Sequence, residues 1–355
     1  MRNISGGGSS SSSKGFPPGD ATNISVGSGI KCVKLKWTDP NNTIEGTTTL
    51  STWQSTVIIR KEGSAPTSIK DGIVVLVNTT KNKYSSTPYT DSNVVVGKTY
   101  YYRFYTLSTD KVYNDSTSMI YKVKILQFGS VLKNNAWEVI NTASESGIAS
   151  SIWNIGDEID ITLSGTFNET ITLQIWDFNH FDKSDGSGKA GIVFGMKNLM
   201  KALQQMNSSN INYGGWNNMF MRNTVMQNIL KSMPSDLQKV IKEVNTYANQ
   251  GGYSTSSSPG RLSKDKVFLP GLTEVYDQWP SQAATESNQK MFPIFTDNNS
   301  RIKKMNNGSG DAQWWWTRSP YYYNDDSFCY VGNSGGGYSA YSASNSYGVC
   351  FCFCI

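Results

Sequence analysis

The sequence predicts a multidomain fold in which an all-β sandwich is followed by an α+β domain. Strand-like runs separated by turn residues extend from residue 16 to residue 126, which is typical of β-sandwiches. From about residue 134 to residue 355, apolar residues spaced three and four apart alternate with strand-like runs, which favours mixed helices and strands. A length of 355 residues suits two or three domains. Residues 1–15 are rich in Gly and Ser and predict a flexible N-terminus.

The first domain is predicted from short runs in which apolar and polar residues alternate. Its expected strands are residues 30–37, 55–63, 72–78, 89–94, 97–108 and 118–126. The run Trp37-Thr38-Asp39-Pro40, together with the Gly-x-Thr-Tyr-x-Tyr-Arg pattern at 97–103, resembles a fibronectin type III module. That resemblance implies that Trp37 and either Tyr100 or Tyr102 are core residues, and that the module is a spacer without chemistry of its own.

The second domain is predicted to begin with two strands and to continue with a helical block. The expected elements are strands at 153–165 and 170–180, helices at 197–206, 219–233 and 236–250, and a short strand or core insertion at 266–271. Ser235 and Gln238 fit a capping box for the third helix, and Gly251-Gly252 would end it. A polar loop containing SSSPG follows at 256–260.

The C-terminal segment, residues 314–355, has an unusual composition. Between Tyr321 and Cys354 it contains no Lys, Glu, Gln, Met or Trp, the five residue types whose codons all end in a purine. Asparagine codons randomised at their two adenines yield the types that are present: Tyr, Asp, Ser, Gly, Cys, Phe, Ala and Asn. Tyr with Ser, Gly and Asn is also the composition of antibody binding loops. A Gly/Ser/Tyr-rich low-complexity tail is the alternative interpretation.

This segment resembles the variable region of the proteins targeted by diversity-generating retroelements, in which adenine-directed mutagenesis rewrites one patch of a C-type-lectin-like fold. The resemblance extends over residues 134–355, which are similar to a C-type-lectin-like domain of formylglycine-generating-enzyme-like architecture. It is carried there by the patterns W-x-I-G-D, G-G-W-x-x-x-x-M-R, F-L-P and F-P-I-F-T-D-x-x-x-R-I-K-K. Cys350-Phe351-Cys352 depart from the family, which has a basic residue, Pro and a small residue there. The residues that match the family's fixed frame are Trp315, Trp316, Arg318, Ser319, Pro320, Phe328, Val331, Ser334, Gly335, Gly348, Val349, Phe353 and Ile355.

The resemblance implies a variable binding segment at about 317–352 on a scaffold that includes Trp315, Trp316, Arg318, Phe328 and Gly348. Of its seven tyrosines, two are expected in the core, and Arg318 is expected to brace a turn. The expected ligand-binding residues are Tyr321, Tyr322, Tyr323, Asn324, Asp325, Asp326, Tyr330, Asn333, Tyr338, Ser339, Tyr341, Ser342 and Tyr347.

Few residues suit catalysis or metal binding. The single histidine, His180, leaves little room for a Ser-His-Asp arrangement and is expected to be a structural hydrogen-bonder. The loop at 182–191 lacks the spacing of a phosphate-binding loop or an EF-hand, so a solvated loop is expected, with calcium at Asp182 and Asp185 as the alternative. Cys350, Cys352 and Cys354 would share one face of a strand, where buried free cysteine, or cysteine arising from randomised codons, is expected rather than zinc.

These observations predict a non-enzymatic protein with no cofactor and no bound metal. The net charge of +5 is mild and its basic residues are scattered, which argues against nucleic-acid binding, and no apolar run is long enough to insert in a membrane. The resemblance implies a host-surface protein or glycan as the ligand, in a homo-oligomer such as a trimer, on a phage tail or, less often, a bacterial surface. The start lacks the apolar region of a secretory signal, which favours the phage. A carbohydrate-active enzyme and a purely structural tail protein are the alternatives.

Overall fold

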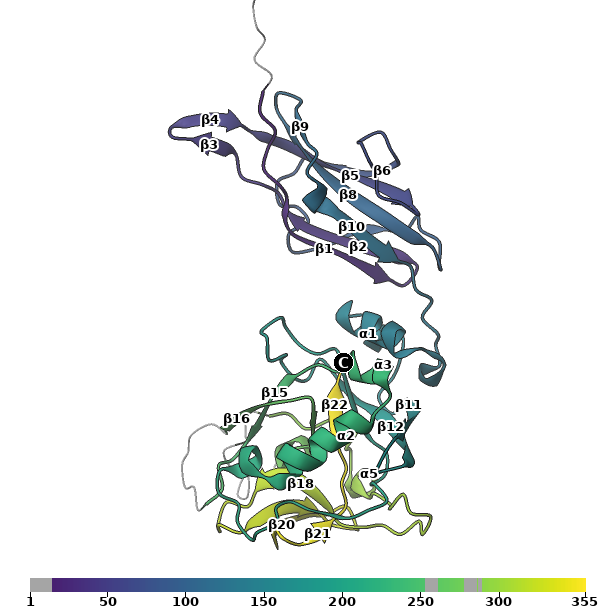
Figure 1. The fold of residues 1–355 in the computed structure, drawn as a ribbon, viewed down its shortest axis with the longest axis vertical. Helices are drawn as coiled ribbons and strands as arrows, with labels where there is room; N and C mark the ends of the chain where they lie inside the picture. Colours follow the sequence, from purple (N-terminus) through teal and green to yellow (C-terminus); the bar gives the residue numbers. More distant parts are fainter. Residues whose placement is uncertain (1–14, 253–260, 278–285, 287–288) are drawn as a thin grey trace, which may run out of the picture. The chain divides into compact units, whose positions relative to one another are not determined.

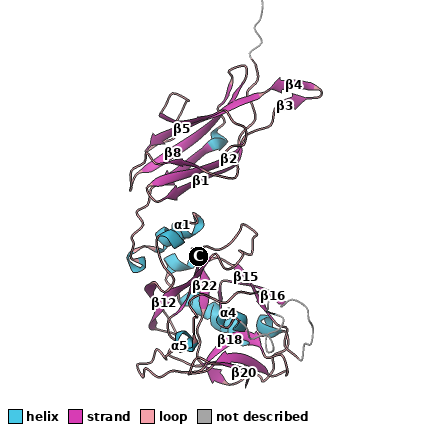
Figure 2. Ribbon diagram, turned by 180° about the vertical axis from the view of Figure 1, so that it is seen from behind, coloured by secondary structure: helices cyan, strands magenta, loops and turns pink. Residues whose placement is uncertain are grey.

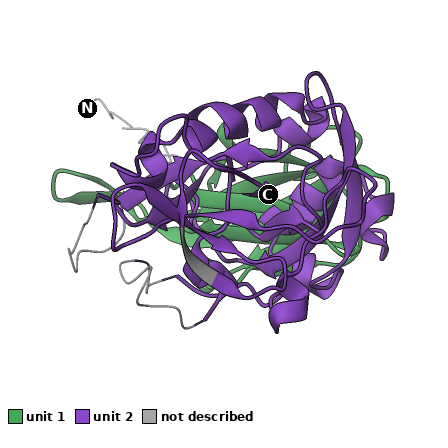
Figure 3. Ribbon diagram, turned by 90° about the horizontal axis from the view of Figure 1, so that it is seen from below, with its two compact units in different colours: residues 1–127 green, residues 128–355 purple. Residues whose placement is uncertain are grey.

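The structure, a computed structural model, describes residues 15–252, 261–277, 286 and 289–355. Two compact units divide the chain, Met1–Gln127 and Phe128–Ile355 (Figure 3). Both units consist mainly of β-strands in several sheets with few, short helices (Figure 2), so the chain has a β-rich multidomain fold. The predicted flexible residues 1–14 and the predicted loop at 256–260 lie outside the described residues. Within the described part, no helix is both long and apolar enough to cross a membrane.

The first unit contains two main antiparallel sheets, with strand orders β1-β2-β7 and β10-β8-β5-β6, and β9 beside β8. All six predicted strands are present. The strands β1 and β9 and the hairpin β3–β4 were not predicted. The strands are β1 (Thr22–Gly29), β2 (Cys32–Thr38), β3 (Thr43–Glu45), β4 (Thr48–Ser51), β5 (Trp53–Glu62), β6 (Ile73–Asn78), β7 (Tyr89–Asp91), β8 (Thr99–Ser108), β9 (Tyr113–Asn114) and β10 (Ile120–Lys124).

The core of the first unit forms around Trp37, which is fully buried. Its indole packs against the Phe104 ring, with ring centroids 5.5 Å apart, and its Nε1 donates to Asp39 Oδ1 at 2.8 Å. Tyr102 is also fully buried and donates its hydroxyl to Asp91 Oδ2 at 2.8 Å. The prediction of Trp37 and a β8 tyrosine as core residues is confirmed.

The second unit is built on a sheet with strand order β11-β12-β13-β22-β17. The chain's last strand, β22, lies between β13 and β17, and all its residues are buried. Three smaller sheets, β18-β19-β20, β14-β21 and β15-β16, complete the unit. The strands are β11 (Glu158–Leu163), β12 (Glu169–Phe178), β13 (Ile192–Met196), β14 (Gln204–Gln205), β15 (Val244–Ala248), β16 (Arg261–Asp265), β17 (Val267–Phe268), β18 (Trp315–Pro320), β19 (Ser327–Val331), β20 (Gly337–Ser342), β21 (Ser346–Tyr347) and β22 (Cys352–Cys354).

The helices are short. Figure 1 shows β18, β20 and β21 gathered at the end of the second unit opposite α1. The helical segments are η1 (Thr117–Met119), η2 (Leu132–Asn134), α1 (Trp137–Glu145), η3 (Ala149–Ser151), η4 (Gly215–Asn218), the π-helical η5 (Met221–Met226), α2 (Gln227–Ser232), α3 (Ser235–Gln238), α4 (Leu272–Val275) and α5 (Asn298–Arg301). The predicted helix at 219–233 is confirmed by the consecutive η5 and α2.

The predicted helix at 197–206 is wrong. This stretch is mostly irregular and ends in β14. Leu199 and Met200 are buried, and their backbone amides bond to distant segments, Leu199 N–H to Lys304 O at 2.9 Å and Met200 N–H to Val349 O at 3.1 Å. Apolar residues at helical spacing are therefore buried here by tertiary packing of an extended chain, which overrides helix propensity.

The predicted helix at 236–250 is also wrong beyond its first turn. Only Ser235–Gln238 is helical, and Val244–Ala248 forms β15, where Val244, Thr246 and Ala248 alternate inward against β16. The expected capping box is absent, because Pro234 is the N-cap and Gln238 Nε2 instead donates to Met233 O at 2.7 Å. Gly251 and Gly252, both at positive φ, end a strand region rather than a helix.

Candidate binding face

The C-terminal segment is ordered into strands, and its frame residues lie inside the unit. Trp315 and Trp316 are neighbours on β18, so their side chains leave opposite faces of the strand, and both are fully buried. Trp315 Nε1 donates to Arg301 O at 3.1 Å and Trp316 Nε1 to Gln204 O at 2.9 Å. Phe328 and Gly348 are buried as well. A Cβ at Gly348 would lie 2.4 Å from Leu199 Cδ1 and 2.9 Å from the backbone oxygen of Trp314, so any side chain here would require its neighbours to shift.

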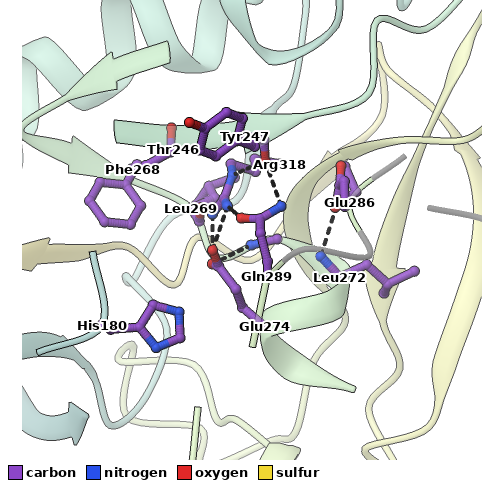
Figure 4. A network of polar contacts seen from close by, with 12 residues as sticks. His180, Thr246, Tyr247, Phe268, Leu269, Leu272, Glu274, Glu286, Gln289 and Arg318 are labelled. Carbon is purple, nitrogen blue, oxygen red and sulfur yellow. Dashed lines mark hydrogen bonds and ion pairs between the residues drawn. The ribbon is translucent and has the colours of Figure 1, made fainter. Parts of the chain in front are cut away.

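Arg318 occupies the centre of a buried polar network (Figure 4). Its two terminal nitrogens bond to Glu274 at 2.7 and 2.6 Å, while its Nε donates to Tyr247 O at 3.0 Å. Burial alone would lower the pKa of the guanidinium, but the charge of Glu274 outweighs it and the net pKa is raised. Because Arg318 is completely buried and its guanidinium is fully hydrogen-bonded, it braces β18 against α4 and is not available as a ligand contact.

Glu286 is a second buried acid beside this network, and no sequence pattern predicted it. Its Oε2 accepts from Ser319 Oγ at 2.5 Å and its Oε1 from Asn249 N–H at 3.1 Å. Burial raises the pKa of Glu286 to about 7, although the nearby Arg318 charge acts in the opposite direction. The frame residue Ser319 in turn accepts from Leu272 N–H at 2.8 Å, so one hydroxyl joins three segments.

The accessible part of the segment lies in two turns and one strand. Tyr323 and Tyr341 are 52% and 40% exposed. Among the remaining predicted contacts, Asn333 is exposed, and half-buried positions make up most of the rest. The half-buried residues are Tyr321, Tyr322, Asn324, Asp325, Asp326 and Ser342. Tyr338 and Ser339 belong to β20, but their side chains lie outside the described residues.

Tyr330 and Tyr347, also predicted as contacts, form an aromatic layer beneath this surface. Both are buried, with ring centroids 5.5 Å apart. Trp314 packs on both rings, and the ring centroid of the exposed Tyr341 lies 5.1 Å from that of Tyr347. Burial, together with a hydrogen bond to Tyr341, raises the pKa of Tyr347. Two of the six tyrosines whose side chains are described are thus core residues; the expected two of seven included Tyr338, whose side chain lies outside the described residues.

Asn212 holds the first turn in place from a separate loop. It is fully buried, and its Nδ2 donates to Asn324 O at 3.0 Å and Ser327 O at 2.9 Å. Its Oδ1 accepts from Gly252 N–H at 2.6 Å. Sequence reasoning missed this residue. Its one available signal in the sequence was the Gly251-Gly252 pair: the backbone of Asn212 approaches Gly251 so closely that a Cβ there would lie 2.0 Å from Asn212 O.

The other residues considered for chemistry lie elsewhere. Cys350, Cys352 and Cys354 are free and buried, and burial raises the pKa of each thiol. His180 Nδ1 bonds to Asp177 Oδ2 at 2.7 Å. Asp182 lies 3.3 Å from Lys189 Nζ across a hairpin. In the described part of the chain, no three His, Cys, Asp or Glu residues lie close enough to hold a metal ion.

Comparison with known protein families finds one match. Residues 191–355, which include the whole C-terminal segment, match a domain of unknown function (DUF6273). The comparison with curated proteins found no match. Among solved structures, the twitchin kinase region from C. elegans is similar at 11% identity and a TM-score of 0.22, covering 51% of this chain. The match spans 31% of that structure, and at this TM-score it carries no argument about fold or activity.

Proposed function

We propose that this chain is a non-enzymatic adhesin whose C-terminal segment presents a retroelement-diversified binding face. The observation that carries the proposal is that the segment's frame residues are buried while its predicted contact residues are largely accessible. The frame residues Trp315, Trp316, Arg318 and Phe328 are fully buried, whereas the turn at 321–326 is accessible in varying degree. Sequence change at the accessible positions would alter the surface while leaving the buried scaffold intact.

The finer fold is part of the same proposal. We assign the first unit to a fibronectin type III-like sandwich, supported by its antiparallel sheets around Trp37. We assign the second to a C-type-lectin-like fold of formylglycine-generating-enzyme-like architecture, supported by the insertion of the C-terminal β22 between β13 and β17. In this architecture the first unit is a spacer and the second is the binding head.

Recognition would rest on the exposed tyrosines and the acidic turn. Tyr323 and Tyr341 offer large amphipathic area with few rotatable bonds, while Asn324 and Ser342 offer adaptable hydrogen bonds. Asp325 and Asp326 add negative charge, which suits a basic protein patch or the hydroxyls of a glycan on a host surface. We propose that the chain forms a homo-oligomer, such as a trimer on a phage tail, in which several copies of the face gain affinity through avidity.

The test is to sequence the codons of residues 314–355 across one natural population, together with any near-copy of that stretch in the same genome. We expect substitutions only where the near-copy has adenine, with the codons of Trp315, Trp316 and Phe328 unchanged. A uniform segment without a near-copy would contradict diversification. Substitutions spread evenly over buried and accessible codons would contradict it equally.

A further inference from the structure

An irregular loop outside the C-terminal segment, residues 207–213, lies against the proposed binding face, and we refer to it as the flanking loop. Asn212 N–H donates to Asp325 O at 2.8 Å. The Asn210 side chain donates to Asp326 Oδ2 at 3.3 Å. The flanking loop is therefore hydrogen-bonded to the first turn of the segment, and its own exposed side chains lie next to that turn.

Two apolar side chains of the flanking loop are exposed. Ile211 is 44% exposed and Tyr213 is 54% exposed, although Asn212, the residue between them, is fully buried. Neither contributes to the hydrophobic core of the second unit. Because the buried Asn212 fixes the backbone between them, both side chains are held at the surface. Apolar side chains that gather at one place on a surface mark interaction sites.

The Tyr213 ring is held in place by the backbone of a glycine. A Cβ added at Gly252 would lie 2.4 Å from both Cδ1 and Cε1 of Tyr213, so the ring rests directly on this glycine. The Gly252 N–H donates in turn to Asn212 Oδ1 at 2.6 Å. A tyrosine that is packed on one side and open on the other loses little conformational entropy on binding. Tyr213 is therefore a pre-organised contact residue.

The charge beside these two residues is negative. Asp325 forms no ion pair and no side-chain hydrogen bond with any described residue, and the Asp326 carboxylate bonds to uncharged side chains. A cation lies past the other end of the flanking loop, where Arg261 donates to Gly214 O at 3.4 Å. The end next to the first turn thus has two acids without a cationic partner among the described residues, which suits a basic side chain on the ligand.

We propose that Ile211 and Tyr213 are a constant part of the binding face, and that its ligand is a protein surface on which an apolar patch adjoins a lysine or arginine. Ile211 gains only by burial against apolar atoms, which a protein surface offers more than the hydroxyl-rich surface of a glycan. The basic side chain pairs with Asp325. This inference rests on the proposed function, because it adds to the varying side chains of the segment two contacts that every variant shares.

The test uses a displayed library of random peptides, selected for binding to the whole chain. We expect the enriched peptides to combine Lys or Arg with aliphatic or aromatic residues. Ile211→Ser and Tyr213→Ser should each weaken their binding at least about tenfold, whereas Tyr213→Phe, which keeps the ring, should bind like the wild type. Asp325→Asn should weaken binding by about fivefold and make it less sensitive to salt.

Matched controls come from the first unit, where Ile44 and Tyr113 are 61% and 40% exposed. Ile44→Ser and Tyr113→Ser should leave peptide binding unchanged. The urea midpoint of each variant shows whether it is folded. Ile211→Ser removes no core contact, so it keeps the test decisive even if Tyr213→Ser lowers that midpoint.

Tyr323→Ser separates this inference from the proposed function. Losses of binding in the loop variants and in Tyr323→Ser are the expected result. A loss in Tyr323→Ser alone would overturn the constant part and leave the proposed face standing. A loss in neither, or in the loop variants alone, would contradict both. Enriched peptides without basic residues, or no enriched peptide at all, would overturn the inference, and binding to a glycan array instead would identify the other class of ligand.

Discussion

Arg318 and Glu274 form a bidentate ion pair in which neither side chain has any exposed surface. Removing two charges from water is costly, so such a pair adds little net stability, but an unpaired survivor is strongly destabilising. Glu274→Gln leaves the Arg318 charge buried without its counterion. We expect this variant to lower the free energy of unfolding by about 3–5 kcal/mol, measured by urea denaturation.

A matched control comes from the first unit, where Glu62 and Lys98 form an exposed ion pair. Glu62→Gln should leave the urea midpoint unchanged, because exposed pairs contribute little. The double variant Arg318→Met with Glu274→Met, which removes both charges, should be more stable than Glu274→Gln. If Glu274→Gln matched the Glu62→Gln control, the brace between β18 and α4 would not depend on charge.

Glu286 predicts a pH dependence of stability. Burial raises its pKa to about 7 in the folded chain, from an ordinary value of 4.5. Between these two values the folded state holds a proton that the unfolded state has lost, so stability falls as the pH rises. We expect the free energy of unfolding to drop by about 3 kcal/mol between pH 4.5 and pH 7 and then to level off on account of this residue.

Glu286→Gln isolates that contribution. Glutamine is neutral at every pH and keeps the size of the side chain, so the decrease attributed to Glu286 should disappear from the urea denaturation series. Glu243→Gln, at an exposed position of the same unit, is the comparison and should retain the decrease. An unchanged pH profile in Glu286→Gln would show that the acid is not held in the neutral form.

Asn212 is expected to control the order of the first turn. Asn212→Ala removes the donor to Asn324 O and Ser327 O and leaves buried carbonyls unsatisfied, at a cost of about 2–3 kcal/mol. Amide hydrogen exchange should accelerate at residues 321–327 more than in β11 and β12. Asn210→Ala is the neighbouring control, since Asn210 is exposed and, among the described residues, bonds only to the side chains of Asp326 and Ser342. Its effect should be within about 0.5 kcal/mol.

Local sequence patterns correctly predicted those elements whose structure depends mainly on residues nearby in the sequence. Trp37 and the alternating strands of the first unit are of this kind. The helices expected at 197–206 and 236–250 failed because the backbone amide of Leu199 and the strand partners of Val244 come from distant segments. Contacts such as Asn212 to Asn324, or Ser319 to Glu286, join residues far apart in the chain. Composition and periodicity carry no information about such pairs, so the roles of Asn212 and Glu286 could be found only from the fold.

Replacing tyrosines of the C-terminal segment tests whether its exposed positions can change without destabilising its buried core. Tyr347 is buried against Trp316, with ring centroids 4.7 Å apart, whereas Tyr323 is 52% exposed. Serine is a natural replacement, because it belongs to the segment's own set of residue types. Tyr347→Ser should lower the free energy of unfolding by about 3 kcal/mol through lost burial and the cavity it leaves. Tyr323→Ser should change it by less than about 0.5 kcal/mol.

Thermal unfolding followed by circular dichroism compares the two variants, and Tyr330→Ser and Tyr341→Ser form a second buried and exposed pair. A large loss in both buried variants and a small one in both exposed variants would mean that only part of the segment is free to vary without unfolding the head. Diversification would then be tolerated at the turn and the exposed strand positions, while Tyr330 and Tyr347 would be limited to residues that fill the same volume. Equal losses at all four positions would instead mean that the tyrosines act together as structural packing, and the exposed ones would no longer qualify as a freely variable surface.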